Sequence, residues 1–173
     1  MDILSVVDDT VASWGRVRPD LDFASMGTMM RLNALVHSMM RRIEEEAVNA
    51  GVTMGEFDVL ATLRRHGDGA TLMPSVIAEV ALVSPSGLTH RLTQLEKAGH
   101  IARMPDPNDR RSSLISITSS GIKIADHVIQ FIVQCTSLLF TSISETRQSR
   151  FAKEIDHCIA ALDELKSADS DAA

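Results

Sequence analysis

The chain has 173 residues, of which 45% are hydrophobic and only 3% aromatic. A chain of this length and hydrophobicity can bury a core, which excludes an intrinsically disordered protein, and the scarcity of aromatics favours helices over a β-sandwich. The formal net charge of −6 argues against nucleic-acid binding by the whole surface. Five cations nevertheless gather within residues 90–111, so one surface of an acidic chain is locally basic: Arg91, Lys97, Arg103, Arg110 and Arg111.

The N-terminal region, residues 1–50, is expected to hold two helices. The first, over residues 2–14, repeats apolar residues at i, i+4, i+8 and i+11, ends with Trp14, and stops before Pro19. The second, over residues 23–49, carries two apolar stripes that are together too wide for contact with one surface. We therefore expect burial by its own domain and by a second subunit, so that this region contributes to dimerisation.

The central region, residues 51–118, changes from short helices to strands. Thr53 and Glu56 have the spacing of a capping box, and Ser84 with Pro85 fits the N-cap and first position of a helix. The expected order is a helix over 53–65, a helix from Pro74, a helix over 84–98, and strands over 101–104 and 114–117. Short helix, turn, capped helix and hairpin is the plan of a winged helix-turn-helix DNA-binding domain.

The C-terminal region, residues 119–173, is expected to hold dimerisation helices and a tail. Thr118 fits the N-cap of one helix, a second helix is expected over 145–166, and the small acidic tail from Ser167 is expected to be loose. The predicted fold is therefore mainly α with a small β-hairpin wing, that is, a winged helix-turn-helix with flanking dimerisation helices.

The helix over 84–98 has two unlike sides. At 3.6 residues per turn, Leu88, Leu92 and Leu95 gather on one side, opposite hydroxyl, amide and imidazole groups. Such groups can meet base edges or phosphates in a major groove, although an ordinary solvated face is the plain alternative. The candidate DNA contacts on this helix are Ser84, Ser86, Thr89, His90, Thr93, Gln94 and Lys97.

The loop between the two strands adds positive charge. Arg110 and Arg111 follow a Pro-Asp-Pro-Asn turn, and an arginine at a hairpin tip can enter a narrow minor groove. A surface salt bridge between Asp109 and Arg111 is the alternative, and both interactions can coexist. Double-stranded DNA is therefore the expected partner.

Three stretches resemble the MarR family of transcriptional regulators, over about residues 25–165. The run Asp109-x-Arg111-x-x-x-Ile115-x-Ile117-Thr118 followed by Gly121 is similar to the family's wing, residues 95–101 to the end of its recognition helix, and residues 57–63 to the first helix of its DNA-binding domain. The resemblance implies a homodimer on a pseudo-palindromic site, usually a repressor. It also implies release from DNA when a small phenolic or anionic molecule binds between the dimerisation and DNA-binding parts.

Within the family, five residues resemble the ligand site of a urate-responsive branch. Trp14, Asp58, Arg91 and Arg103 occupy matching places, while His37 lies one position off. Arg91 lies near the leucine side of its helix and could reach an anion, and Asp58 sits in an apolar run where a carboxylate needs an arginine partner. A small anionic aromatic effector such as urate is thus the expected ligand. Structural roles are the alternatives: Trp14 in an apolar face, an Asp58–Arg103 ion pair, and His37 in the core.

Other functions find less support. The sequence has no phosphate-binding glycine loop, no H-E-x-x-H motif and no evident nucleophile with its base, so an enzyme with catalytic residues is not expected. The six histidines form no close ligand pairs, and neither a metal nor a cofactor is expected. A redox-sensing regulator using Cys135 or Cys158, and a protein-interaction module without specific DNA binding, stay open, although both thiols are expected to be packed. With no secretory signal or apolar run long enough to span a membrane, the chain is expected to be cytoplasmic.

Overall fold

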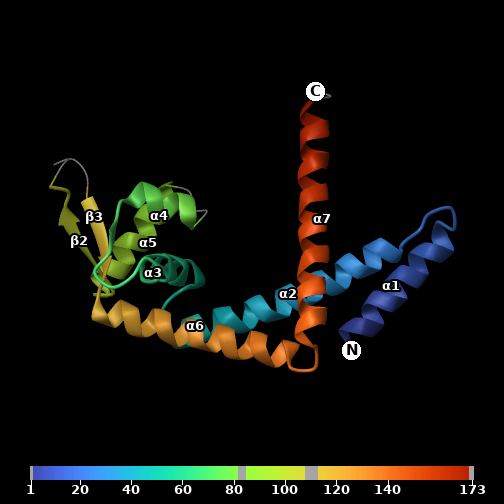
Figure 1. Cartoon of the computed structure of the whole chain (residues 1–173), viewed down its shortest axis with the longest axis horizontal. Helices are drawn as coiled ribbons and strands as arrows, with labels where there is room; N and C mark the ends of the chain where they lie inside the picture. The colour runs from blue at the N-terminus through green and yellow to red at the C-terminus, as the bar shows by residue number, and fades with distance from the viewer. Residues whose placement is uncertain (1, 82–84, 108–112, 172–173) are drawn as a thin grey trace. The chain divides into compact units, whose positions relative to one another are not determined.

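The computed structural model describes residues 2–81, 85–107 and 113–171. These residues form helices and one small antiparallel sheet, which confirms the predicted mainly α fold with a small β element (Figure 1). The chain divides into two compact units, Met1–Phe131 and Ile132–Ala173. The candidate site lies in the first unit.

Two helices, α1 (Ile3–Val17) and α2 (Ala24–Asn49), pack against each other at the start of the first unit. They approach closely at Gly27, where a Cβ would lie 3.0 Å from Cγ2 of Val11. An ion pair between Asp8 and Arg31 also joins them. Both helices fall where the sequence predicted them, although α1 continues to Val17, one turn beyond its expected end.

Three short helices form the centre of the first unit: α3 (Met54–Arg65), α4 (Pro74–Val80) and α5 (Pro85–Lys97). The predicted capping box is present, since the Glu56 amide donates to Thr53 Oγ1 at 3.3 Å and Glu56 Oε2 accepts from the Thr53 amide at 2.8 Å. The core between the helices is built from fully buried aliphatic and aromatic side chains. They include Phe57, Val59, Leu60 and Leu63 of α3, Ile77 of α4, and Leu88, Leu92 and Leu95 of α5.

The sheet contains the predicted hairpin and one strand that was not predicted. Strands β2 (Ile101–Pro105) and β3 (Ser113–Ile117) pair antiparallel, with Arg103 opposite Ile115. The two-residue strand β1 (Thr71–Leu72) pairs with the other edge of β3, which gives the order β1-β3-β2. Two residues are too few to produce a periodic pattern, so the sequence alone could not reveal β1.

Helix α6 (Ser119–Phe140) follows β3, and α7 (Glu145–Asp171) ends the described chain. Thr118 begins α6 as predicted: its hydroxyl accepts from the Gly121 amide at 3.2 Å and donates to the Gly99 carbonyl at 2.8 Å. The expected loose tail from Ser167 was wrong as far as Asp171, because α7 continues through it. No glycine or proline follows Lys166 to stop the helix, and each further residue adds a hydrogen bond.

Among the described residues, α6 is the one helix long and apolar enough to cross a membrane by length and composition. A single such helix is weak evidence for a membrane protein. Polar contacts tie its first half to the first unit: Asp126 accepts from Arg64 at 2.7 Å, and His127 Nε2 lies 2.6 Å from Oε1 of Glu46. The first half of α6 is therefore held on the first unit by polar contacts.

Candidate nucleic-acid interface

Helix α5 turns its leucine side inward. Leu88, Leu92 and Leu95 are 2%, 1% and 1% exposed, and α5 packs on α3, α4 and β2. Burying three leucines fixes which side of α5 faces the core, since each contributes about 1.5–3 kcal/mol relative to its exposed state. The opposite side of the helix is thereby directed outward.

The outward side of α5 carries the polar residues expected to meet DNA. The exposed members are Ser86, Thr89, His90, Gln94 and Lys97, while Thr93 is half-buried. The Thr93 hydroxyl donates to the Thr89 carbonyl at 2.9 Å, as threonines within helices commonly do. Ser84, Arg110 and Arg111, with Asp109, lie outside the described residues.

An ion pair connects the base of the hairpin to α5. Arg103 Nε of β2 donates to Glu96 Oε2 at 2.7 Å, and both side chains are part-exposed. The sequence analysis offered an ion pair between Asp58 and Arg103 as an alternative, whereas in the structure Arg103 pairs with Glu96. The sequence analysis did not single out Glu96, because only the packing of α5 beside β2 brings the two charges together.

A second arginine of α5 lies on α3. The guanidinium of Arg91 covers Gly55 in the first turn of α3, so closely that a Cβ at position 55 would lie 2.4 Å from Arg91 Cζ. Asp58, three residues further along α3, is half-buried. Burial raises the pKa of the Asp58 carboxyl, and the nearby charge of Arg91 opposes that rise. The structure thus brings together two of the five expected ligand-binding residues.

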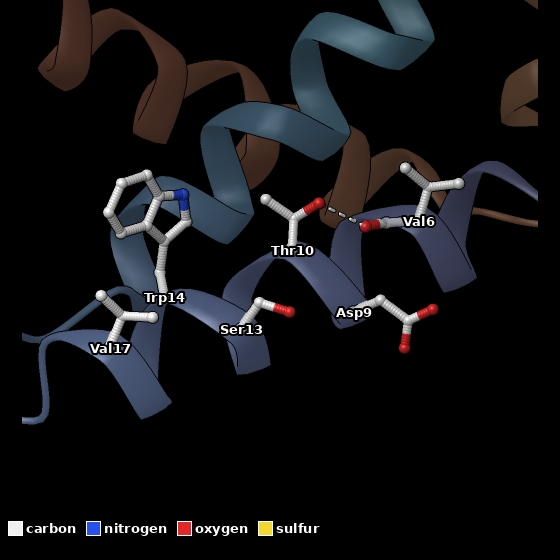
Figure 2. A pocket seen from close by; sticks show the side chains of 6 residues that line it. All are labelled: Val6, Asp9, Thr10, Ser13, Trp14 and Val17. Carbon is white, nitrogen blue, oxygen red and sulfur yellow. Dashed lines mark hydrogen bonds between the residues drawn. The ribbon is translucent and has the colours of Figure 1, made fainter.

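The other expected ligand residues lie elsewhere on the described chain. Trp14 of α1 is 48% exposed and stacks on Phe23, with ring centroids 6.1 Å apart. It lines an open groove of about 460 Å³ along one face of α1, with Val6, Asp9, Thr10, Ser13 and Val17 (Figure 2). His37 is exposed on α2, so a core role for it is wrong in the single chain.

The described residues give little support for a metal site or for a redox-active thiol. No group of three or more His, Cys, Asp or Glu side chains there could hold a metal ion. Cys135 is half-buried and Cys158 is exposed. The expectation that both thiols are packed was therefore wrong for Cys158 in the single chain, because no other described residue covers this side chain of α7.

A helix with a buried leucine side and an outward polar side, placed next to an antiparallel hairpin, defines a winged helix-turn-helix protein. Comparison with known proteins agrees. A family model described as "MarR family" matches residues 52–113, from just before α3 to the start of β3. The chain is also 35% identical over 146 residues to the HTH-type transcriptional regulator PecS of Dickeya dadantii, covering 83% of this chain and 86% of PecS.

The chain belongs to the MarR family of transcriptional regulators, which bind DNA. It is 30% identical over 105 residues to the multiple antibiotic resistance protein MarR of Escherichia coli, covering 60% of this chain and 71% of MarR. Among solved structures, a MarR family transcription regulator, SP03579, superposes with a TM-score of 0.74 at 16% identity, covering 81% of this chain and 91% of that one. These relatives are regulators, so the expectation that the chain is not an enzyme is confirmed.

Proposed function

We propose that the chain is a cytoplasmic, homodimeric repressor that binds a pseudo-palindromic operator and leaves it when a small anionic aromatic ligand binds. The observation that carries the proposal is the outward polar side of α5, held in place by three buried leucines. In this proposal α5 enters the major groove, where His90 and Gln94 reach base edges. Arg110 and Arg111 of the wing approach the adjacent minor groove.

Uncovered apolar side chains support the homodimer. In the single chain, large hydrophobic residues of α1, α2, α6 and α7 stay exposed, which is costly in water unless another surface covers them. They include Ile3, Leu4 and Val17 of α1, Met29, Val36 and Met40 of α2, Val133 and Leu138 of α6, and Phe151, Ile159 and Leu162 of α7. A two-fold dimer would cover such faces and place two α5 helices on half-sites about 34 Å apart.

The proximity of Asp58 and Arg91 supports the ligand response. Arg91 belongs to α5, so an anion that competes with Asp58 for its guanidinium acts directly on the element that reads DNA. The proposed ligand site comprises Trp14, His37, Asp58, Arg91 and Arg103, and urate is the proposed representative ligand. An aromatic ligand would stack on the exposed indole of Trp14.

Selection of bound fragments from the source genome tests DNA recognition. We expect enrichment of an inverted repeat whose half-site centres lie about 10 base pairs apart. Enrichment of no sequence over random DNA would reject the operator proposal and favour a winged-helix interaction module.

A urate titration tests the ligand response separately. Trp14 is the single tryptophan, so urate binding is expected to quench its fluorescence over the same concentrations that release the selected operator. Unchanged fluorescence and operator affinity at millimolar urate would reject urate as the effector. If peroxide treatment abolished operator binding by the wild type but not by Cys158→Ser, the result would favour the redox alternative.

A further inference from the structure

Gly55 is the second residue of α3, directly after the capping position and Met54. Glycine destabilises a helix relative to alanine because its backbone loses more conformational freedom on folding. Its usual compensation, a positive φ, does not apply at this position. The reason for a glycine must therefore be sought in the space around it.

That space is filled by one functional group. A Cβ at position 55 would lie 2.4 Å from Cζ, 2.6 Å from Nε and 2.7 Å from Nη2 of Arg91, so all three nearest atoms belong to the guanidinium. Cβ atoms essentially never approach other heavy atoms within 3.0 Å. Any residue other than glycine would displace the guanidinium from this place, which we call the Arg91 seat.

The Arg91 seat is an unusual location for a cation. The N-terminal end of a helix carries partial positive charge and repels a guanidinium. Asp58 compensates from the same side of α3, as its position three residues after Gly55 requires. Burial raises the pKa of Asp58, and the positive charge of Arg91 acts against that rise.

We propose that Gly55 is a positioning residue for DNA recognition: its missing side chain admits the Arg91 guanidinium onto α3, and this contact adjusts the rotation of α5 about its own axis within the orientation that the buried leucines fix. Arg91 directly follows His90, which is exposed on the outward side. Anchoring Arg91 inward therefore holds His90 outward. The inference rests on the proposed function in that α5 reads the operator, and it assigns a role to a residue that touches neither DNA nor ligand.

A double-mutant cycle on operator affinity tests the inference. The four full-length proteins are wild type, Gly55→Ala, Arg91→Ala and the double variant. We expect each single variant to bind the selected operator about tenfold more weakly than the wild type. This factor lies within the range of interaction energies found between residues in contact. The double variant should bind no more weakly than either single one, because Gly55 acts only through Arg91. Losses that multiply in the double variant, or wild-type affinity of Gly55→Ala, would overturn the inference.

Gly15→Ala is the matched control. Gly15 is also helical and half-buried, but no atom lies within 4 Å of a Cβ built there. We expect this variant to keep wild-type operator affinity. Binding to random DNA separates positioning from a folding defect. Gly55→Ala releases the Arg91 guanidinium from α3 and should keep or strengthen binding to random DNA. A misfolded protein would lose binding both to the operator and to random DNA. Parallel loss on both DNAs would overturn the inference.

A measurement on the protein alone separates this inference from the proposed function. The pKa of Asp58, followed by NMR, should rise in Gly55→Ala because the guanidinium moves away, and Gly55→Ala should have no further effect in the Arg91→Ala background. Wild type that selects no operator would reject the proposed function, while an unshifted Asp58 pKa would reject the Arg91 seat. If Gly55→Ala does not fold, the test compares Arg91→Ala with the double variant. The inference expects these two proteins to have the same operator affinity and the same Asp58 pKa. A difference in either quantity would overturn the inference.

Discussion

Gly121→Ala should destabilise the junction between the wing and α6. A Cβ at this buried position would lie 2.2 Å from the His100 carbonyl oxygen and 2.8 Å from Cγ1 of Ile117. Unlike the guanidinium over Gly55, the His100 carbonyl is backbone, and it already accepts a hydrogen bond from the Thr118 amide at 3.0 Å. The new methyl group can therefore be accommodated only if the backbone at His100, directly before β2, moves away from α6.

The expected loss combines overpacking with the strained hydrogen bond. Overpacking a core costs roughly 1–3 kcal/mol, a lost hydrogen bond about 0.5–1.5 kcal/mol, and alanine in a helix regains about 0.5–1 kcal/mol. We expect the free energy of unfolding to fall by about 2–3 kcal/mol, which for a chain of this size lowers Tm by roughly 4–12 °C.

Urea denaturation followed by circular dichroism measures this loss. Protein concentration must be held constant because the proposed dimerisation would couple stability to concentration. Gly15→Ala again serves as the control, with unchanged or slightly higher stability, since a Cβ there meets open space. A loss below about 0.5 kcal/mol for Gly121→Ala would mean that the junction relaxes freely, and it would refute the steric argument.

Three further predictions concern DNA and pH. His90→Ala should relax base preference at one operator position by roughly 1–3 kcal/mol, measured as Kd on singly substituted operators; equal discrimination would remove His90 from the reading face. Arg110→Ala should weaken binding to all DNA and reduce the slope of log K against log salt by about 0.9, whereas an unchanged slope would contradict a close approach of the Arg110 charge to DNA. Burial raises the pKa of Asp58 above 3.8, so the stability it contributes is fully present below that pH and is lost as pH rises through the native pKa. Between about pH 4 and pH 7, the free energy of unfolding of Asp58→Asn should therefore decrease less with rising pH than that of the wild type. Denaturation measured across that range would contradict the prediction if both proteins showed the same dependence of the unfolding free energy on pH.

Helix boundaries and the sides of helices could be predicted because they depend on residues close together in the chain. The capping box of Thr53 and Glu56 and the leucine side of α5 both lie where the sequence placed them. Within the described residues, β1 escaped detection and the ends of α1 and α7 were misplaced. The local signal was a two-residue strand for β1 and a polar tail without a stop residue for α7.

Contacts between elements were harder to predict than the elements themselves. The sequence offered Arg103 and Asp58 as a possible ion pair, but the structure pairs Arg103 with Glu96 at 2.7 Å and brings Arg91 near Asp58. Both arginines could reach a carboxylate, and composition cannot choose between carboxylates on different elements. A glycine inside the capping box, between Thr53 and Glu56, was the one local signal that could have pointed to the Arg91 seat.

The sequence by itself determined the order of the elements, the inward leucines of α5 and the polar groups on its other side, because periodicity and capping are properties of neighbouring residues. The tertiary structure alone decided that Arg91 lies over Gly55 and that Glu96 holds Arg103. These contacts depend on how α3, α5 and β2 pack, and a difference of a few ångströms in that packing selects one partner for each charge.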